Sequence, residues 1–348
     1  MEAPIDLSQV QALWEPTGPY LNTASYGLPP TPAFEALHAA LADWRFGATS
    51  WEHWGEATEG ARAVFARLVR VPAEQVAVSA TVSQLIGLVA AWLPDGARVL
   101  APDIEFTSLL FPFLAHADRG VEVVTVPTDR LVEAIDATTT LVAFSAVQSA
   151  TGQVTDSGAV VAAARQHGAL TVVDATQACG WLPLDASWFD FLACGAYKWL
   201  MSPRGTAFLT VRNEHLATMR PLAAGWYAGE EPQASYYGPP LRLARAARRL
   251  DTSPAWFSWV GTQPALELVE RIGIDVIQEH DVALANRFRA GLGLPAADSA
   301  IVSAEVPDAA ARLERAGIRA AVRAGSLRAS FHVYNTEGDV DAALEALR

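Results

Sequence analysis

TVVDATQACGWLPLDASWFDFLACGAYKWLMSPRG, residues 171–205, says more about the architecture of this protein than any other stretch of the chain. One apolar run ends at Asp174, and a second ends just before Lys198. Apolar runs of strand length, without polar alternation, are typical of strands buried in the parallel sheet of an α/β protein. Ligands of such sheets bind at the carboxyl ends of the strands. We therefore expect Asp174 and Lys198 to lie at one edge of one sheet.

These two polar groups form a pair that suits one kind of cofactor. The amine of a lysine can form a Schiff base with an aldehyde, and an aspartate can hold a proton on a pyridinium nitrogen. Taken singly, an aspartate at a strand end is often a helix cap, and a lysine is usually a solvated charge. Lys198 is flanked by Tyr197 and Trp199, however, which is unusual for a surface lysine. The pair therefore favours an aromatic aldehyde cofactor.

Composition restricts the class of protein and its partners. The chain has 348 residues, 51% of them hydrophobic, and a formal net charge of −13. A core of this size suits one large unit or two domains, and the acidic balance argues against nucleic acid or an anionic membrane as partner. Cys179 and Cys194 both lie in apolar runs, which is typical of buried thiols in a reducing cytoplasm. No signal-peptide pattern is visible, and the longest apolar run, 85–93, is too short to span a bilayer.

Strand and helix patterns alternate along most of the chain, which predicts a mostly parallel sheet. After residue 300 the pattern changes to short strands at 301–305, 320–323 and 326–335, with a helix at 308–316. We therefore expect a second, smaller α/β unit at the C-terminus. The predicted organisation is an arm at 1–19, a large domain at 20–255, and a small domain at 256–348 that includes a long connecting helix at about 262–291.

Two further features predict anion-binding positions. The turn from Ala80 to Ser83 lies between a strand-like run and an apolar helix, so free backbone N–H groups at the helix start can hold a phosphate. Thr81 or Ser83 can add a hydroxyl, although either residue can instead serve as a helix cap. Arg328 lies in a strand between apolar residues, where a charge needs a partner. That partner is either a structural carboxylate or a ligand.

The motifs in these stretches resemble those of a known family. They are Asp174-Ala175-Thr176-Gln177, Tyr197-Lys198-Trp199 and Pro203-Arg204-Gly205. The sequence resembles the class V aminotransferases of fold type I, pyridoxal 5'-phosphate (PLP) enzymes that include cysteine desulfurases, isopenicillin N epimerase-like proteins and C–S lyases. The resemblance extends from Tyr20 to Tyr334. It implies an α/β fold, with a mostly parallel seven-stranded sheet in the large domain, a smaller α/β C-terminal domain, and PLP as the cofactor.

The resemblance also implies roles for individual residues. Lys198 and Asp174 are the catalytic pair, and the other cofactor contacts implied are Thr81, Val82, Phe106, Gln148, Gln177, Tyr197, Gly261 and Thr262. The last two are implied to reach the phosphate of a neighbouring subunit, which implies a homodimer with shared sites. Asn22, Tyr26, Gln148 and Arg328 are implied substrate contacts, with Arg328 on the α-carboxylate. No metal site is expected.

Some positions depart from the family pattern. Ala80-Thr81-Val82 stands where relatives often have Gly-Thr-Thr, so one hydroxyl donor is missing. Phe106 stands where relatives stack a histidine on the cofactor ring, and it can stack without transferring protons. Tyr197 stands where relatives hold a histidine against the phosphate.

Four features keep two interpretations each. The loop at 46–54, with Trp51 and Trp54, is too apolar to lie free in water and is either a cover of the site or an interface. His53 is either structural or a proton shuttle. The basic patch at 242–249 is either an exposed face or an attractor of anions. Thr262 can also be a helix N-cap, with Pro264 following it.

The expected chemistry is removal of a proton from Cα of an amino acid or an amino-acid-derived metabolite. Aminotransfer and C–S or other β-elimination are the leading outcomes, and epimerisation of the isopenicillin N type is the alternative. A catalytically degenerate PLP-binding or regulatory protein is the alternative from another class. No cysteine follows Cys194, which argues against desulfuration through a catalytic cysteine. We find no Walker loop, HExxH, GxSxG or Rossmann fingerprint.

Overall fold

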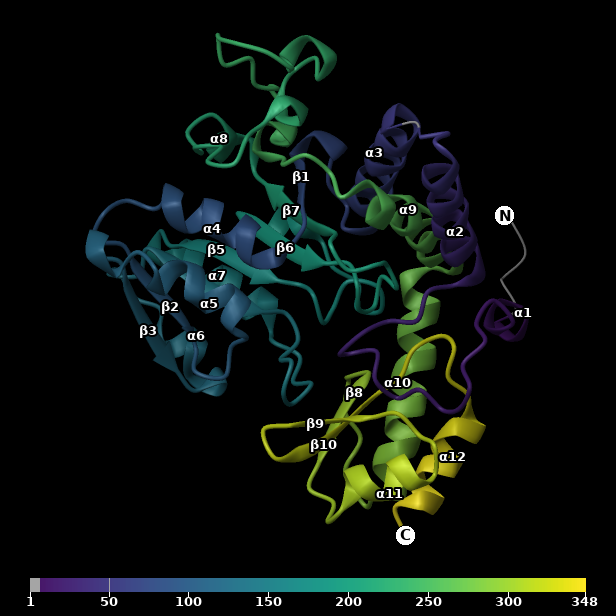
Figure 1. Ribbon diagram of the computed structural model, residues 1–348. Coiled ribbons are helices and arrows are strands. Elements are labelled where there is room, and N and C mark those ends of the chain that lie inside the picture. The colour runs from purple at the N-terminus through teal and green to yellow at the C-terminus, as the bar shows by residue number, and fades with distance from the viewer. Residues whose placement is uncertain (1–6, 50) are drawn as a thin grey trace.

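The computed structural model describes residues 7–49 and 51–348, and its main feature is a seven-stranded sheet (Figure 1). The strand order is β1-β7-β6-β5-β4-β2-β3. Only β7 runs antiparallel to its neighbours, so the predicted mostly parallel sheet is confirmed. The strands are β1 (Val76–Ser79), β2 (Arg98–Pro102), β3 (Glu122–Val126), β4 (Leu141–Ser145), β5 (Leu170–Asp174), β6 (Phe191–Gly195) and β7 (Ala207–Val211).

Both faces of this sheet are covered by helices, which explains the continuous apolar runs of the central strands. On one face α4 (Val82–Trp92) and α5 (Thr107–Leu114) pack against residues such as Val172. On the other face α3 (Trp51–Leu68), α6 (Leu131–Ala134), α7 (Ser157–His167) and α9 (Trp256–Ile272) pack against residues such as Val173. Successive residues of one strand thus enter opposite cores.

A second sheet of three antiparallel strands carries the C-terminal part of the chain. Its order is β8-β10-β9, and the helices α10, α11 and α12 pack with it around a core of its own. The capping box of Thr336 and Asp339 fixes the start of the last helix. These elements are β8 (Ile301–Ala304), β9 (Ala321–Arg323), β10 (Ser326–Ser330), α10 (Ile274–Gly291), α11 (Ala309–Arg315) and α12 (Glu337–Ala346).

The segment 20–27 runs between the two sheets. Tyr20 and Asn22 form bridges with Arg319 and Ser330 of the small-sheet region, and Gly27 donates its N–H to the carbonyl of Tyr197. This segment therefore contacts the small sheet at its start and the lysine-bearing region at its end. The remaining helices are α1 (Leu7–Gln11), α2 (Thr31–Phe46) and α8 (Asn213–Leu216).

The structure differs from the sequence-based expectation at three elements. Trp51 and Trp54 belong to α3 rather than a loop, because the buried Trp54 packs on Trp256 and Phe257 of α9. The connecting helix begins at Trp256 and breaks at Gly273, where φ is 91°. The strand expected at 326–335 ends at Ser330 and is followed by a turn. Within the described residues no helix is long and apolar enough to cross a membrane.

Candidate active site

A cavity opens at the carboxyl ends of the central strands, between the starts of α4 and α5. It is lined by Ala80, Thr81, Val82, Ser83, Phe106, Ser108, Ser145, Val147, Ser149, Asp174, Thr176, Gln177, Gly195, Tyr197, Lys198, Arg204 and Thr206. Seven of the predicted site residues are in this lining: Thr81, Val82, Phe106, Asp174, Gln177, Tyr197 and Lys198. The expectation that Asp174 and Lys198 share one edge of the sheet is met, because both follow adjacent parallel strands, β5 and β6.

Lys198 lies three residues after the end of β6, and its side chain is almost completely buried. Its Nζ lies 5.6 Å from the ring centroid of Phe106 and 5.7 Å from that of Tyr197. Burial lowers the pKa of Lys198 to about 8, although the charge of Asp174 opposes this shift. Lys198 is also the only lysine in the sequence. The cavity therefore contains the chain's one lysine amine, poised to lose its proton near neutral pH.

Asp174, the last residue of β5, is the buried acid of the cavity. Its Oδ1 accepts a hydrogen bond of 2.9 Å from the backbone N–H of Thr176. Burial raises the pKa of Asp174, while Thr176 and Lys198 favour its charged form. A cationic ring nitrogen placed here would relieve that desolvation cost.

The start of α4 supplies the donors for an anion. Thr81 is the N-cap, and its hydroxyl accepts from the N–H of Gln84 at 3.3 Å. The first turn of this helix, Val82 and Ser83, also lines the cavity, as do Arg204 and Thr206, which precede the neighbouring strand β7. Unpaired N–H groups and the helix dipole favour negative charge at this end. An amine, a carboxylate and a helix start that can accept an anion lie in one cavity, which fits the aldehyde, ring nitrogen and phosphate of PLP.

Arg328 is a buried cation without an acidic partner. Its side chain is 2% exposed on β10, and no carboxylate of the described chain lies within 4 Å of it. Its Nη1 donates to the carbonyl and the hydroxyl of Ser149, at 2.6 and 3.2 Å, and its Nη2 donates to Ser25 at 2.8 Å. Burial, and next Arg323, lower the pKa of Arg328 to about 10. The group is held by neutral oxygens and leaves its charge for an anionic ligand.

Gln177 connects the region of Arg328 to the lysine-bearing segment, and Gln148 does not. Gln177 donates to the carbonyl of Ala24 and to the Ser149 hydroxyl, and accepts from the indole N–H of Trp199 at 2.9 Å. Gln148 lies outside the lining; it donates to Glu105 at 2.6 Å, and its buried Oε1 has no partner in the described structure.

Glu105 in turn accepts from the backbone N–H of Ser145, and burial raises the pKa of Glu105. The implied contact of Gln177 with the cofactor ring oxygen stays a prediction, because both of its amide protons already have acceptors.

The other predicted residues lie farther from this cavity. Tyr26 accepts a hydrogen bond from the backbone N–H of Arg204, and Asn22 has a buried Oδ1 without a partner in the described chain. Gly261 lies inside α9, as does Thr262, whose buried hydroxyl donates to the carbonyl of Ser258 at 2.8 Å. Neither reaches the cavity of its own chain, and their role toward a neighbouring subunit stays a prediction.

The tryptophan-rich region does not line the cavity either. Trp51 contacts the rings of Trp226, Tyr236 and Trp256 instead. His53 is exposed beside Glu56.

Comparisons with known proteins agree with this geometry. The family model "Aminotransferase class-V" matches residues 45–296, which is most of the chain. The chain belongs to the class-V aminotransferase family. Isopenicillin N epimerase of Streptomyces clavuligerus is 30% identical over 390 residues, which cover 96% of this chain and 95% of that protein. The uncharacterized aminotransferase YcbU of Bacillus subtilis is 29% identical over 339 residues, 90% of each chain.

The fold of this class-V aminotransferase relative is shared by solved structures. The cystine C–S lyase C-DES, solved in complex with its product cysteine persulfide, superposes with a TM-score of 0.86 at 23% identity and covers 95% of this chain and 97% of its own. The predicted fold type is thus confirmed, and the protein is a PLP-dependent enzyme of the class-V family.

Two residues of this class-V site escaped the sequence analysis. Ser25 and Ser149 hold the guanidinium of Arg328 from opposite ends. Both stand beside residues that the resemblance did single out, Tyr26 and Gln148, but a serine in a loop carries no pattern that indicates its partner. A third residue that escaped the sequence analysis is Glu105, whose carboxylate accepts hydrogen bonds from Ser145 and Gln148.

Proposed function

We propose that this enzyme binds an α-amino acid through Arg328, removes its Cα proton with Lys198, and completes either aminotransfer or β-elimination. The observation that carries the proposal is the unpaired guanidinium of Arg328. A bidentate bond with a carboxylate would satisfy this buried charge. Arg328 and Gln177 share the hydroxyl of Ser149, so the anion site adjoins the cofactor cavity.

Each residue of the cavity has a distinct task in this proposal. When bound, PLP supplies a conjugated ring that withdraws electrons from Cα. The Asp174 carboxylate would hold the proton on the ring nitrogen, and the start of α4 at Thr81 would hold the phosphate. The Lys198 amine, with a pKa of about 8, is matched to taking and returning a proton near neutral pH. Phe106 offers an apolar ring against the cofactor face.

The relative with 30% identity, isopenicillin N epimerase, makes epimerisation the second candidate. Epimerisation needs a proton carrier on each side of Cα. Phe106 cannot carry a proton, and burial raises the pKa of the Tyr197 hydroxyl, which makes it a weaker acid. Aminotransfer and elimination need only Lys198 as base, which is why we place them first.

We further propose that the protein works in the cytoplasm as a homodimer. Both cysteines are free and buried, as suits a reducing compartment. Phe34, Leu41 and Trp44 are exposed at spacings of seven and three residues, so they lie on one side of α2, a face suited to a second copy. Sedimentation velocity tests the dimer, and a monomer at micromolar concentration would contradict it.

The cofactor is tested by the visible absorption spectrum of the purified protein before and after borohydride. We expect a band that borohydride removes, with a pyridoxyl group on the peptide that contains Lys198. Because the chain has a single lysine, the only competing amine is the N-terminus, and the Lys198→Arg variant is the matched control. If no band appears after addition of PLP, the catalytically degenerate protein remains as the interpretation.

The reaction is tested by product analysis with amino acids and cysteine conjugates. Amino transfer to an added keto acid identifies a transaminase. Ammonia and pyruvate with a released thiol identify a C–S lyase, and the D-amino acid alone identifies an epimerase. A loaded protein that yields none of these products would refute the proposed function.

A further inference from the structure

A buried histidine–aspartate pair lies behind the lysine of the site. His332 follows β10, Asp281 lies on α10, and both side chains are completely buried. His332 Nδ1 lies 2.9 Å from Asp281 Oδ2, and His332 Nε2 lies 2.9 Å from the carbonyl oxygen of Trp199. Trp199 directly follows Lys198. The small sheet thus contacts the lysine-bearing segment through one imidazole.

The acceptor chemistry fixes how this imidazole works. A carbonyl oxygen only accepts, so Nε2 carries the proton that bonds to Trp199. A second proton must then lie between Nδ1 and the Asp281 carboxyl, whichever group holds it. The other oxygen of Asp281 is buried without a partner in the described structure. Burying such a pair costs desolvation free energy, so its presence does not imply that it stabilises the fold. A role beyond stability is therefore worth seeking.

The segment that His332 holds is confined on its other side as well. Gly27 donates its N–H to the carbonyl of Tyr197 at 2.9 Å, and a Cβ at Gly27 would lie 1.9 Å from the carbonyl oxygen of Lys198. Met201 adopts a φ of 52°, which is unusual for a residue with a side chain. The backbone on both sides of Lys198 is therefore fixed, and the hydrogen bond from His332 is one of its restraints.

A chain of hydrogen bonds links this restraint to the anion site. The Trp199 indole donates to Gln177, Gln177 donates to the Ser149 hydroxyl, and Arg328 donates to the same hydroxyl. Arg328 and His332 are four residues apart on one stretch of chain. That stretch therefore contacts both the proposed carboxylate site and the backbone of the proposed base.

We propose that His332, oriented by Asp281, is a positioning residue that sets where the Lys198 amine stands relative to Arg328 and the cofactor. The proposal rests on the function proposed above. His332 touches neither substrate nor cofactor in this arrangement. It acts through the carbonyl of Trp199.

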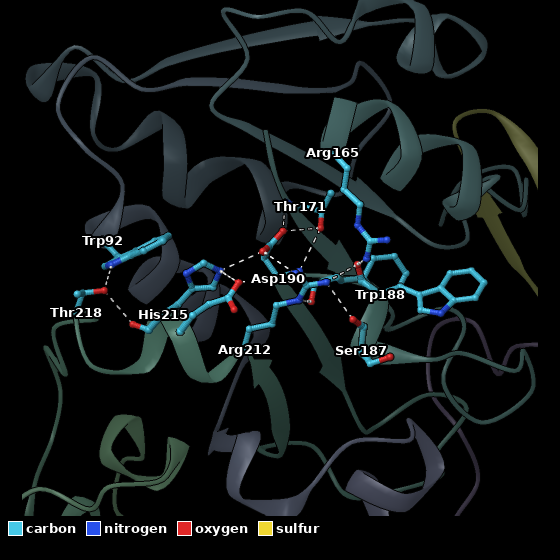
Figure 2. A network of polar contacts seen from close by, with 11 residues as sticks. Trp92, Arg165, Thr171, Ser187, Trp188, Asp190, Arg212, His215 and Thr218 are labelled. Carbon is cyan, nitrogen blue, oxygen red and sulfur yellow. Dashed lines mark hydrogen bonds and ion pairs between the residues drawn. The ribbon is translucent and has the colours of Figure 1, made fainter. Parts of the chain in front are cut away.

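Two substitutions separate the two bonds of the imidazole. In His332→Gln the amide nitrogen can replace Nε2 and donate to Trp199, while the bond to Asp281 is lost. In His332→Asn the amide can replace Nδ1 and bond to Asp281, while the bond to Trp199 is lost. A third histidine variant controls for stability: His215 forms another pair with a carboxylate, Asp190, at 3.0 Å, near the amino end of β6 and away from the cavity (Figure 2). His215→Asn breaks that pair and leaves the lysine segment untouched.

The first readout uses the apoprotein. Reductive ¹³C-methylation labels the N-terminus and the single lysine, so one NMR resonance reports the titration midpoint of Lys198. We expect His332→Asn to move this midpoint by about half a pH unit or more, since a displaced amine changes its distance to Asp174. His332→Gln and His215→Asn should keep the wild-type midpoint.

The second readout is the steady-state kinetics of the holoenzyme. We expect His332→Asn to lower kcat about tenfold or more with a smaller change of KM, and His332→Gln to recover most of that loss. If both His332 variants lose the same amount of melting temperature but keep the wild-type titration midpoint and kcat, the inference is overturned. The histidine–aspartate pair would then have only a structural role. A wild-type protein without turnover would refute the proposed function, while the apoprotein titration would still decide the positioning role.

Discussion

Replacing Arg328 with methionine should weaken substrate binding at little cost in stability. Burial lowers the pKa of Arg328 to about 10, more than two units below that of a solvated guanidinium, which corresponds to about 3 kcal/mol of unfavourable free energy for the charged form at pH 7. Methionine removes this cost and fills similar volume. It also removes the hydrogen bonds to Ser149 and Ser25, and the loss of their buried partner costs about 1–3 kcal/mol. The two contributions nearly cancel.

We therefore expect the free energy of unfolding of the Arg328→Met apoprotein to lie within about 1–2 kcal/mol of the wild type, from urea denaturation at pH 7. Binding of an amino acid, followed by the change in cofactor absorption, should weaken about 30-fold or more, because the substrate carboxylate loses a buried charged partner worth at least about 2 kcal/mol. Arg328→Lys is the matched control, since it keeps the charge and loses the fork geometry.

The opposite pattern would refute this reasoning. A loss of about 3–5 kcal/mol in stability with unchanged amino-acid affinity is what breaking a buried structural ion pair produces. It would mean that Arg328 has a carboxylate partner within the protein and not in the substrate.

Three other predictions concern Lys198 and its surroundings. The folded state lowers the pKa of Lys198 to about 8, so the unfolded apoprotein binds more protons than the folded one between about pH 8 and 10.4. Across this window the unfolding free energy of the wild type should rise by about 3 kcal/mol relative to that of Lys198→Met, from urea denaturation at each pH. A constant difference between the two proteins at every pH would contradict this prediction. Asp174→Asn should lower kcat by about 10²–10³-fold with the cofactor still bound, measured at saturating PLP, and a wild-type kcat would exclude the role of the carboxylate at the ring nitrogen. Gly27→Ala should lower stability by about 1–3 kcal/mol and weaken PLP binding, because the added methyl group meets the carbonyl of Lys198. Thermal melting and titration with PLP measure the two effects. If neither changes, the lysine-bearing segment is free to move.

The sheet and the position of Asp174 and Lys198 at its edge were predictable because local pattern determines them. The apolar run that ends at Asp174 matches the end of β5, and the run that ends just before Lys198 contains β6, which stops at Gly195. The parallel pairing of these strands brings Asp174 and Lys198 to the same edge. The burial of Arg328 was predictable for a related reason, since it lies between apolar residues of a strand, while its contact with a substrate stays a prediction.

Residues that are placed only by tertiary contact were not predictable. Trp51 and Trp54 follow a Gly-containing stretch that indicates a loop, and only their packing against Trp256 and Phe257 explains a helix there. Thr262 stands before Gln-Pro and fits a helix cap by its sequence. The packing of Trp259 and neighbouring apolar residues starts α9 earlier and encloses it.

The distance between the proposed base and the proposed carboxylate site is set by residues that neither motif includes. Lys198 belongs to the large sheet and Arg328 to the small one, so their separation depends on how the two sheets are joined. The segment 20–27 is part of that join: it bridges to the small sheet at Asn22, holds Arg328 through Ser25, and meets the lysine backbone at Gly27. These three contacts lie within six residues, so they restrict how far the two sheets can move relative to each other. A change in this segment should therefore alter which amino acids fit, while the strands that carry Asp174 and Lys198 stay as they are.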